Sequence, residues 1–207
     1  GVQLLDNLKA HIQDLSDDKL EGRRTGTAGE KLAMEYISNQ FSSTGLLPKG
    51  TSNYYQAFEV NEGKQIDPST ELSINGSKLE SGKEYFPFPY SAPGKMEALP
   101  AIAVQEADMP WFVDLKDALE ENKANPHFDL ADYIYTNTKK AKDRGATALF
   151  IYNASGTDDK LVFNGKDKSA TLTIPVMYIT TEAAAKYLKD PSATINVNFV
   201  VSLSDKK

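Results

Sequence analysis

The chain has 207 residues, of which 40% are hydrophobic and 25% are charged, and its net charge at pH 7 is −6. This composition is typical of a folded globular protein and excludes a disordered one. Acidic and basic residues are interspersed without a basic stripe, so nucleic acid is not expected as a partner. No apolar run approaches the roughly 20 residues of a membrane-spanning helix, so no membrane span is expected. The absence of cysteine excludes disulfides and thiolate metal sites.

The first 24 residues predict an amphipathic helix followed by a short turn. Apolar residues recur there at spacings of three and four, which is the period of one helix face. These residues are Leu5, Leu8, Ile12 and Leu15. Ser16 is expected to cap the next turn, and Gly22 to end it.

A second helix is predicted from about residue 28. Thr27 and Glu30 have the spacing of a capping box, in which each side chain accepts a hydrogen bond from a free backbone N–H of the first turn. The apolar face of this helix consists of Ala33, Ile37 and Phe41. Gly45 suits the end of the helix, and Pro48 prevents its continuation.

The aromatic content of residues 54–60 predicts a short strand, and after it the sequence pattern changes from helical to loop-rich and β-like. We therefore expect a helical arm over residues 1–60 and a β-rich domain over residues 61–207. Asn75-Gly76 predicts a two-residue hairpin turn. Residues 101–104 are expected to form a buried strand, and residues 111–113 a further strand.

An aromatic and proline-rich stretch covers residues 85–90. Its prolines lack the N–H groups that a central strand needs, so it cannot be one. Its aromatic side chains are candidates for an exposed platform that binds sugar or peptide: Tyr85, Phe86, Phe88 and Tyr90. The favoured alternative is a buried arm that packs along a sheet edge.

The second half predicts regular elements in close succession. A helix is expected over residues 130–144, ended by Gly145, with an inner face of Ala131, Ile134, Thr138 and Ala141. Strands are expected over residues 146–152, 173–179 and 195–203, and Thr180 or Thr181 should cap a short helix to about residue 188. The predicted fold class is mixed α/β (α+β): a β-rich domain with flanking helices, preceded by the helical arm.

No residue is assigned to catalysis or metal binding. His127 beside Asp129 could act as a ligand or base, but one histidine without partners makes neither a triad nor a zinc centre. His11 is expected at the flank of the first helix's apolar stripe. Asp158, Asp159, Asn164 and Asp167 offer oxygen ligands for calcium but lack calcium-loop spacing, and they are interpreted as a solvated acidic loop. Glu21 and Arg23 could grip a substrate carboxylate, although a structural pair that fixes the turn is favoured.

Two groups of motifs resemble known families. The first is Leu20, Glu21, Gly22 and Arg23, then Gly26, Thr27 and Glu30, then Gly45-Leu46-Leu47-Pro48, then Tyr55-Gln56-Ala57-Phe58. In this order they resemble the N-terminal region of bacterial zinc aminopeptidases that carry an inserted protease-associated domain. The second is Gly145-Ala146 at the helix end and Ile174-Pro175-Val176 before a short helix, which resembles the protease-associated domain itself.

The resemblance implies a non-catalytic N-terminal and protease-associated portion of an exported zinc aminopeptidase, which gates or contributes to substrate recognition. Its implied partners are a peptidase catalytic domain in cis and the peptide substrate. No cofactor is expected in this chain, because the family's zinc ligands follow the inserted domain; zinc is expected in the full-length parent. The implied location is extracytoplasmic. The alternative is a stand-alone extracytoplasmic module that binds peptide or glycan.

Overall fold

The computed structural model describes residues 2–206 and contains both helices and sheets, which confirms the mixed α+β class. The chain divides into two compact units, residues 1–59 and 60–207. None of the helices within residues 2–206 has the length and apolar character that crossing a bilayer requires.

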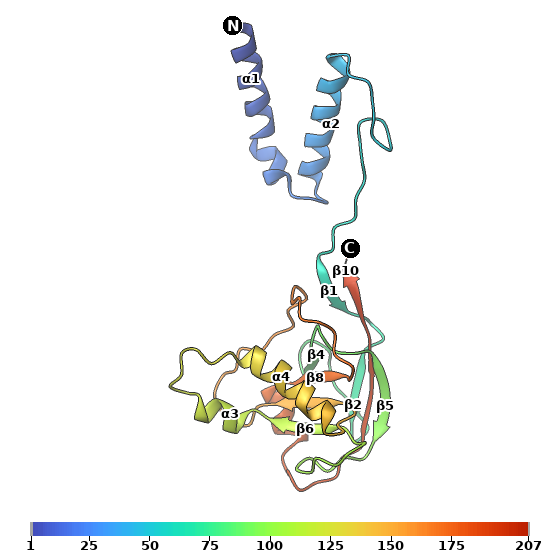
Figure 1. The fold of residues 1–207 in the computed structure, drawn as a ribbon, viewed down its shortest axis with the longest axis vertical. Helices are drawn as coiled ribbons and strands as arrows, with labels where there is room; N and C mark the ends of the chain where they lie inside the picture. The colour runs from blue at the N-terminus through green and yellow to red at the C-terminus, as the bar shows by residue number, and fades with distance from the viewer. Residues whose placement is uncertain (1, 207) are drawn as a thin grey trace. The chain divides into compact units, whose positions relative to one another are not determined.

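The first unit consists of α1 (Val2–Leu15), the 3₁₀ turn η1 (Asp18–Arg23) and α2 (Ala28–Ser43) (Figure 1). The two predicted helices are confirmed. Asp17, and not Ser16, caps the turn between them, because its carboxylate accepts a hydrogen bond from the Lys19 amide at 2.9 Å. Leu20 is the buried residue of η1 and packs against the start of α2.

The strand predicted over residues 54–60 is wrong. Residues 51–55 form a turn with a single bridge between Ser52 and Tyr55, and no strand pairs with residues 56–60. Phe58 and Val60 are exposed there. Aromatic content favours a strand only where a neighbouring strand can take up its backbone hydrogen bonds, and this segment has no such neighbour among the described residues.

The second unit contains two four-stranded sheets and a two-stranded ribbon. The first sheet is antiparallel, in the order β3-β2-β9-β5. The second has the order β4-β8-β7-β6, in which β7 is parallel to β6 and β8 and β4 is antiparallel to β8. The ribbon pairs β1 with β10. The bounds are β1 (Gly63–Ile66), β2 (Glu71–Ile74), β3 (Ser77–Lys78), β4 (Tyr85–Pro87), β5 (Gly94–Ala98), β6 (Trp111–Asp114), β7 (Leu149–Tyr152), β8 (Val176–Ile179), β9 (Val197–Val201) and β10 (Leu203–Lys206).

Two cores lie on opposite faces of the second sheet. Successive residues of a strand point to opposite faces, so Phe150 faces the first sheet and α5 (Thr181–Tyr187), whereas Leu149 and Ile151 face α4 (Leu130–Asp143). Both faces of β7 are therefore covered, which explains its uninterrupted apolar sequence. A short helix, α3 (Lys116–Glu121), follows β6 (Figure 1).

Several predictions of local structure in this unit are confirmed. Asn75 and Gly76 form the turn between β2 and β3, both with positive φ (49° and 80°), as a two-residue hairpin of this type requires. Thr180 caps α5, and Gly145 follows the end of α4 with a φ of 103°.

Other predictions in this unit need correction. Residues 101–104 form no strand: Ala101 makes one isolated bridge with Thr194, and Val104 is exposed. Ala131 is exposed on α4, while the other three residues of the predicted inner face are buried. The single strand predicted over residues 195–203 is divided at Ser202, where the chain leaves the first sheet and enters the ribbon.

Candidate functional site

The turn from Leu20 to Glu30 is a compact structure in the first unit. Thr27 Oγ1 accepts a hydrogen bond from the Glu30 amide at 3.4 Å, as in a capping box. The Glu30 carboxylate accepts instead from the amide of Gly26, at 2.6 Å, one residue before the expected partner. The carboxylate thus ties the glycine-rich connection to the start of α2.

The backbone of η1 passes very close to α2. A Cβ atom at Gly29 would lie 1.9 Å from the Leu20 carbonyl oxygen, so only glycine fits at this position. Glu21, Gly22 and Arg23 all have left-handed conformations, with φ of 45°, 71° and 56°. A left-handed conformation costs free energy for residues other than glycine, so the backbone of this turn is constrained.

The predicted ion pair between Glu21 and Arg23 is not formed. Both side chains are exposed, and no ion pair within residues 2–206 joins them. The shape of the turn comes from Asp17, Thr27 and Glu30 instead. The side chains of Glu21 and Arg23 are therefore exposed and make no ion pair with each other.

The aromatic stretch is buried and forms no exposed platform. Tyr85, Phe86, Phe88 and Tyr90 are between 1% and 6% exposed. β4 is an edge strand beside β8, as the prolines predict. The Tyr85 hydroxyl donates to the Thr70 carbonyl oxygen at 3.1 Å. Burial raises the pKa of Tyr90, whose hydroxyl has no hydrogen-bond partner among the described residues. The interpretation as a buried arm along a sheet edge is the one that fits.

The two histidines lie in separate, ordinary surroundings. His11 Nδ1 is 2.7 Å from the Tyr36 hydroxyl and so links α1 to α2. His127 is exposed, and its amide donates to the Asn125 side chain. Asp129 caps α4 by accepting from the Asp132 amide at 3.0 Å. His127 and Asp129 therefore form no catalytic or metal-binding pair with each other.

The side-chain oxygens of the acidic loop between β7 and β8 accept hydrogen bonds from groups within the loop and from β8. Asp158, Asn164 and Asp167 each accept from an amide two residues ahead. Asp159 accepts from the Tyr178 hydroxyl at 2.6 Å and from Asn153 at 2.9 Å. Within residues 2–206, no three histidine, cysteine, aspartate or glutamate side chains come together as a possible metal site.

The remaining motif residues have structural roles in the second unit. The Gly145 amide donates to the Lys142 carbonyl at 3.0 Å at the end of α4. A Cβ atom there would lie 2.9 Å from the Ala107 side chain. The Pro175 carbonyl accepts from the Leu149 amide at 2.9 Å and so aligns β8 with β7.

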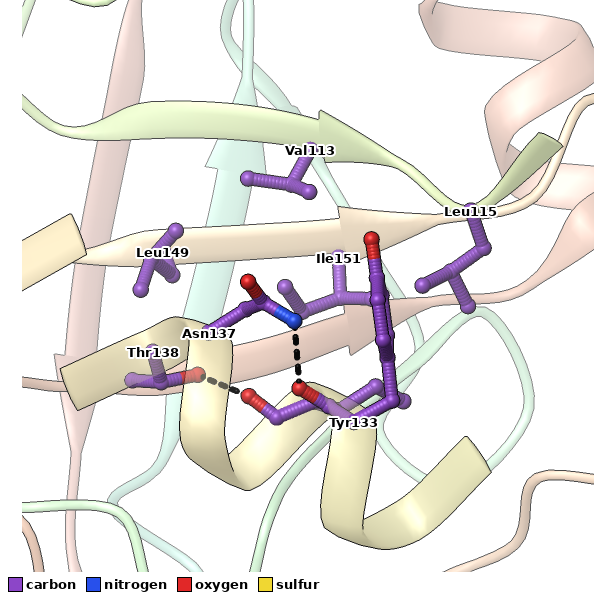
Figure 2. A pocket seen from close by; sticks show the side chains of 8 residues that line it. Val113, Leu115, Tyr133, Asn137, Thr138, Leu149 and Ile151 are labelled. Carbon is purple, nitrogen blue, oxygen red and sulfur yellow. Dashed lines mark hydrogen bonds between the residues drawn. The ribbon is translucent and has the colours of Figure 1, made fainter. Parts of the chain in front are cut away.

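A small apolar pocket lies between α4 and the second sheet, and no sequence motif indicates it. Its volume is about 20 Å³. It is lined by Val113, Leu115, Tyr133, Ile134, Asn137, Thr138, Leu149 and Ile151 (Figure 2). These residues come from β6, β7 and α4 and from the residue that follows β6. The sequence predicted the strands at 111–113 and 146–152 and the apolar face of α4 that surround the pocket, but not the pocket itself.

Comparison with known proteins gives structural similarities only. No family model matches the chain, and no curated protein matches it. Among solved structures, it is similar to a zinc aminopeptidase from Bacillus subtilis, with 19% identity over 95% of this chain and 42% of that one and a TM-score of 0.44. A peptidase M28 precursor from Shewanella amazonensis gives 13% identity over 96% and 50% of the two chains, with a TM-score of 0.40.

A subtilisin-like protease from Antarctic Pseudoalteromonas sp. AS-11 gives 19% identity over 72% of this chain and 34% of that one, with a TM-score of 0.33. This chain thus spans half or less of the length of each of these proteins. At these identities and TM-scores the similarities do not establish a family.

Proposed function

We propose that the chain is a non-catalytic portion of an exported zinc aminopeptidase, made of an N-terminal helical arm and a protease-associated domain. In this proposal the zinc and the peptide-cleaving groups belong to a peptidase domain of the same polypeptide. The portion described here gates peptide entry or contributes to substrate recognition. Such a role needs only shape and a few polar groups, because contacts remote from the reacting bond can still orient a substrate.

The observation that carries the proposal is the uncovered apolar surface of the arm. α1 buries no residue, and α2 buries only Gly29 and Ala33. Eight of their large apolar side chains are 39–68% exposed: Leu4, Leu5, Leu8 and Ile12 on α1, and Leu32, Met34, Ile37 and Phe41 on α2. Burial of one such side chain contributes about 1.5–3 kcal/mol. Short helices in water depend on this kind of packing, so the arm needs a further apolar surface, which a peptidase domain in cis would supply.

The closeness of the two ends of the second unit supports the proposal that this unit is an inserted domain. β1 and β10 pair in an antiparallel ribbon, with Gly63 opposite Lys206. The two ends of the unit therefore lie side by side. A domain with adjacent ends can be placed within a longer chain without disturbing the structure on either side of it.

The test compares the 207-residue chain with the longer product of the same reading frame. We expect the 207-residue chain to retain no stoichiometric zinc after dialysis and to leave a leucyl-anilide substrate intact when zinc is added, because catalytic zinc needs about three protein ligands. The longer product should hydrolyse the substrate, and a chelator should abolish this activity. Chelator-sensitive turnover by the 207-residue chain would contradict the proposal. A stop codon directly after Lys207 would favour the stand-alone binding module.

A matched pair of variants tests the arm in the longer product. Leu8→Gln together with Ile12→Gln removes the apolar stripe of α1 and should lower the Tm of the longer product. Asp6→Gln, on the opposite side of the same helix, should leave it unchanged. In the isolated 207-residue chain the paired substitution should leave the unfolding of the second unit unaffected. An equal response of the longer product to both variants would contradict the role of the stripe.

A further inference from the structure

β6 is an edge strand with an unpaired backbone side. The Trp111 amide donates to the carbonyl of Ala148, just before β7, at 2.9 Å, and the Leu115 amide donates to that of Tyr152 in β7, at 2.8 Å. In a parallel pair, alternate residues direct both of their backbone groups to the neighbouring strand. Phe112 and Asp114 therefore direct their N–H and C=O groups away from β7, and within residues 2–206 no hydrogen bond reaches these groups. Such an edge is a template for one more strand.

The apolar pocket lies on the α4 side of this edge. Val113 points from β6 into the pocket, and Leu115 borders it just beyond the strand (Figure 2). A space of about 20 Å³ holds one group of the size of a methyl. The Asn137 side-chain amide donates to the Tyr133 carbonyl at 2.8 Å, and its oxygen has no partner among the described residues. The pocket thus offers room for one small apolar side chain and one acceptor beside it.

The charges around the edge differ between its two ends. α4 runs back opposite to β6 (Figure 1), and the Arg144 guanidinium after its last residue lies 5.2 Å from the ring of Trp111 at the start of β6. The end where β6 begins is therefore net basic, because Lys139, Lys140, Lys142 and Arg144 outnumber Asp143, which pairs with Lys142. The end where β6 finishes is net acidic, because Asp117, Glu120, Glu121 and Asp132, on α3 and the first turn of α4, outnumber Lys116.

We propose that β6 and α4 form a peptide-binding groove in which an extended peptide joins the sheet antiparallel to β6. The backbone of the peptide pairs with Phe112 and Asp114, and one alanine-sized side chain occupies the pocket beside Val113. An antiparallel peptide places a positively charged N-terminal end at the acidic end of the groove and a negatively charged C-terminal end at the basic one. Main-chain pairing supplies affinity and the pocket supplies selectivity, as in other strand-addition sites. The identification of the ligand as a substrate peptide rests on the proposed function; the groove itself does not.

The probe is the blocked peptide acetyl-Lys-Thr-Ala-Val-Ala-Thr-Glu-amide, and the protein is the 207-residue chain. Trp111, the one tryptophan of the sequence, reports saturable binding by its fluorescence. Amide exchange measured by NMR should show new protection at Phe112 and Asp114, with Trp111 and Val113 unchanged because they already bond to β7. A peptide in which the Lys and Glu have swapped positions should bind at least threefold more weakly. N-methylation of alternate peptide residues should abolish binding for one alternation and spare it for the other.

Val113→Ile adds one methylene group to the pocket and should weaken binding at least tenfold. Val162→Ile, the same change at an exposed position, should leave binding unchanged. Absence of saturable binding up to millimolar peptide, protection at residues outside β6, or equal effects of both N-methylation patterns would overturn the groove. None of these measurements uses peptidase activity, so a failure here is distinct from a failure of the zinc and hydrolysis test above.

Discussion

Replacing Tyr90 by phenylalanine should stabilise the second unit, although it removes a polar group from a native core. The Tyr90 ring is 3% exposed, stacks on Phe88 at 5.2 Å and meets Tyr135 edge-on at 5.0 Å. Its hydroxyl has no hydrogen-bond partner among the described residues. A buried polar group without a partner costs about 1–3 kcal/mol. Phenylalanine keeps the ring contacts and removes this cost, so we expect a gain of about 1 kcal/mol.

Tyr85→Phe is the matched control, because Tyr85 is equally buried but bonded. Its hydroxyl donates to the Thr70 carbonyl, and a hydrogen bond of this kind contributes about 0.5–1.5 kcal/mol net. The same atom is removed in both variants, and the expected changes have opposite signs. For a unit of this size each kcal/mol shifts the Tm by roughly 2–4 °C.

The assay is urea unfolding followed by the fluorescence of Trp111, which lies in the same core as Tyr90. The midpoint should rise for Tyr90→Phe and fall for Tyr85→Phe, with an unchanged slope in both cases. A fall of similar size in both variants would refute the reasoning, because it would show that the Tyr90 hydroxyl is hydrogen-bonded in solution.

Two further predictions concern other parts of the chain. Gly29→Ala should separate Leu20 from α2 and lower the helical content of the first unit measured by circular dichroism, because the lost burial of about 1.5–3 kcal/mol exceeds the helix-propensity gain of about 1 kcal/mol. The control Asn39→Ala, on the exposed face of α2, should raise the helical content. Equal behaviour of the two variants would contradict the close approach of Leu20 to Gly29. The hydroxyl of Ser202, followed by that of Ser204, holds the pKa of Asp67 below its ordinary value. The stability that Asp67 contributes should therefore be present above pH of about 4 and be lost as the pH falls through its lower folded-state pKa. Asp67→Asn should remove this component from an acid titration followed by Tm, and an unaltered acid profile would count against it.

The local elements that the sequence predicts well are those whose signal depends on few neighbours. The Asn75-Gly76 turn, the Thr27 cap and the apolar face of α4 each follow from residues close together in the chain. The errors at residues 54–60 and 101–104 have the opposite character. Both segments are apolar enough for a strand, but a strand also needs a partner, and only the fold decides whether one is present.

The candidate groove could not be predicted for the same reason. Val113 and Tyr133 are 20 positions apart in the sequence, and they line one pocket only because α4 packs across β6 and β7. That β6 is an edge depends on the strand order of the whole sheet.

The pairing of Gly63 with Lys206 has a practical consequence for protein engineering. Paired strands bring opposing Cα atoms within about 4.5–5.5 Å, so a short linker can join the two ends of the second unit. The chain could then be opened at the exposed Asn75-Gly76 turn to give a circular permutant with the same sheets. The same closeness allows the unit to replace the turn of an unrelated hairpin. The ribbon thus makes the second unit a portable module, and the proposed peptide groove can be tested on any host that displays it.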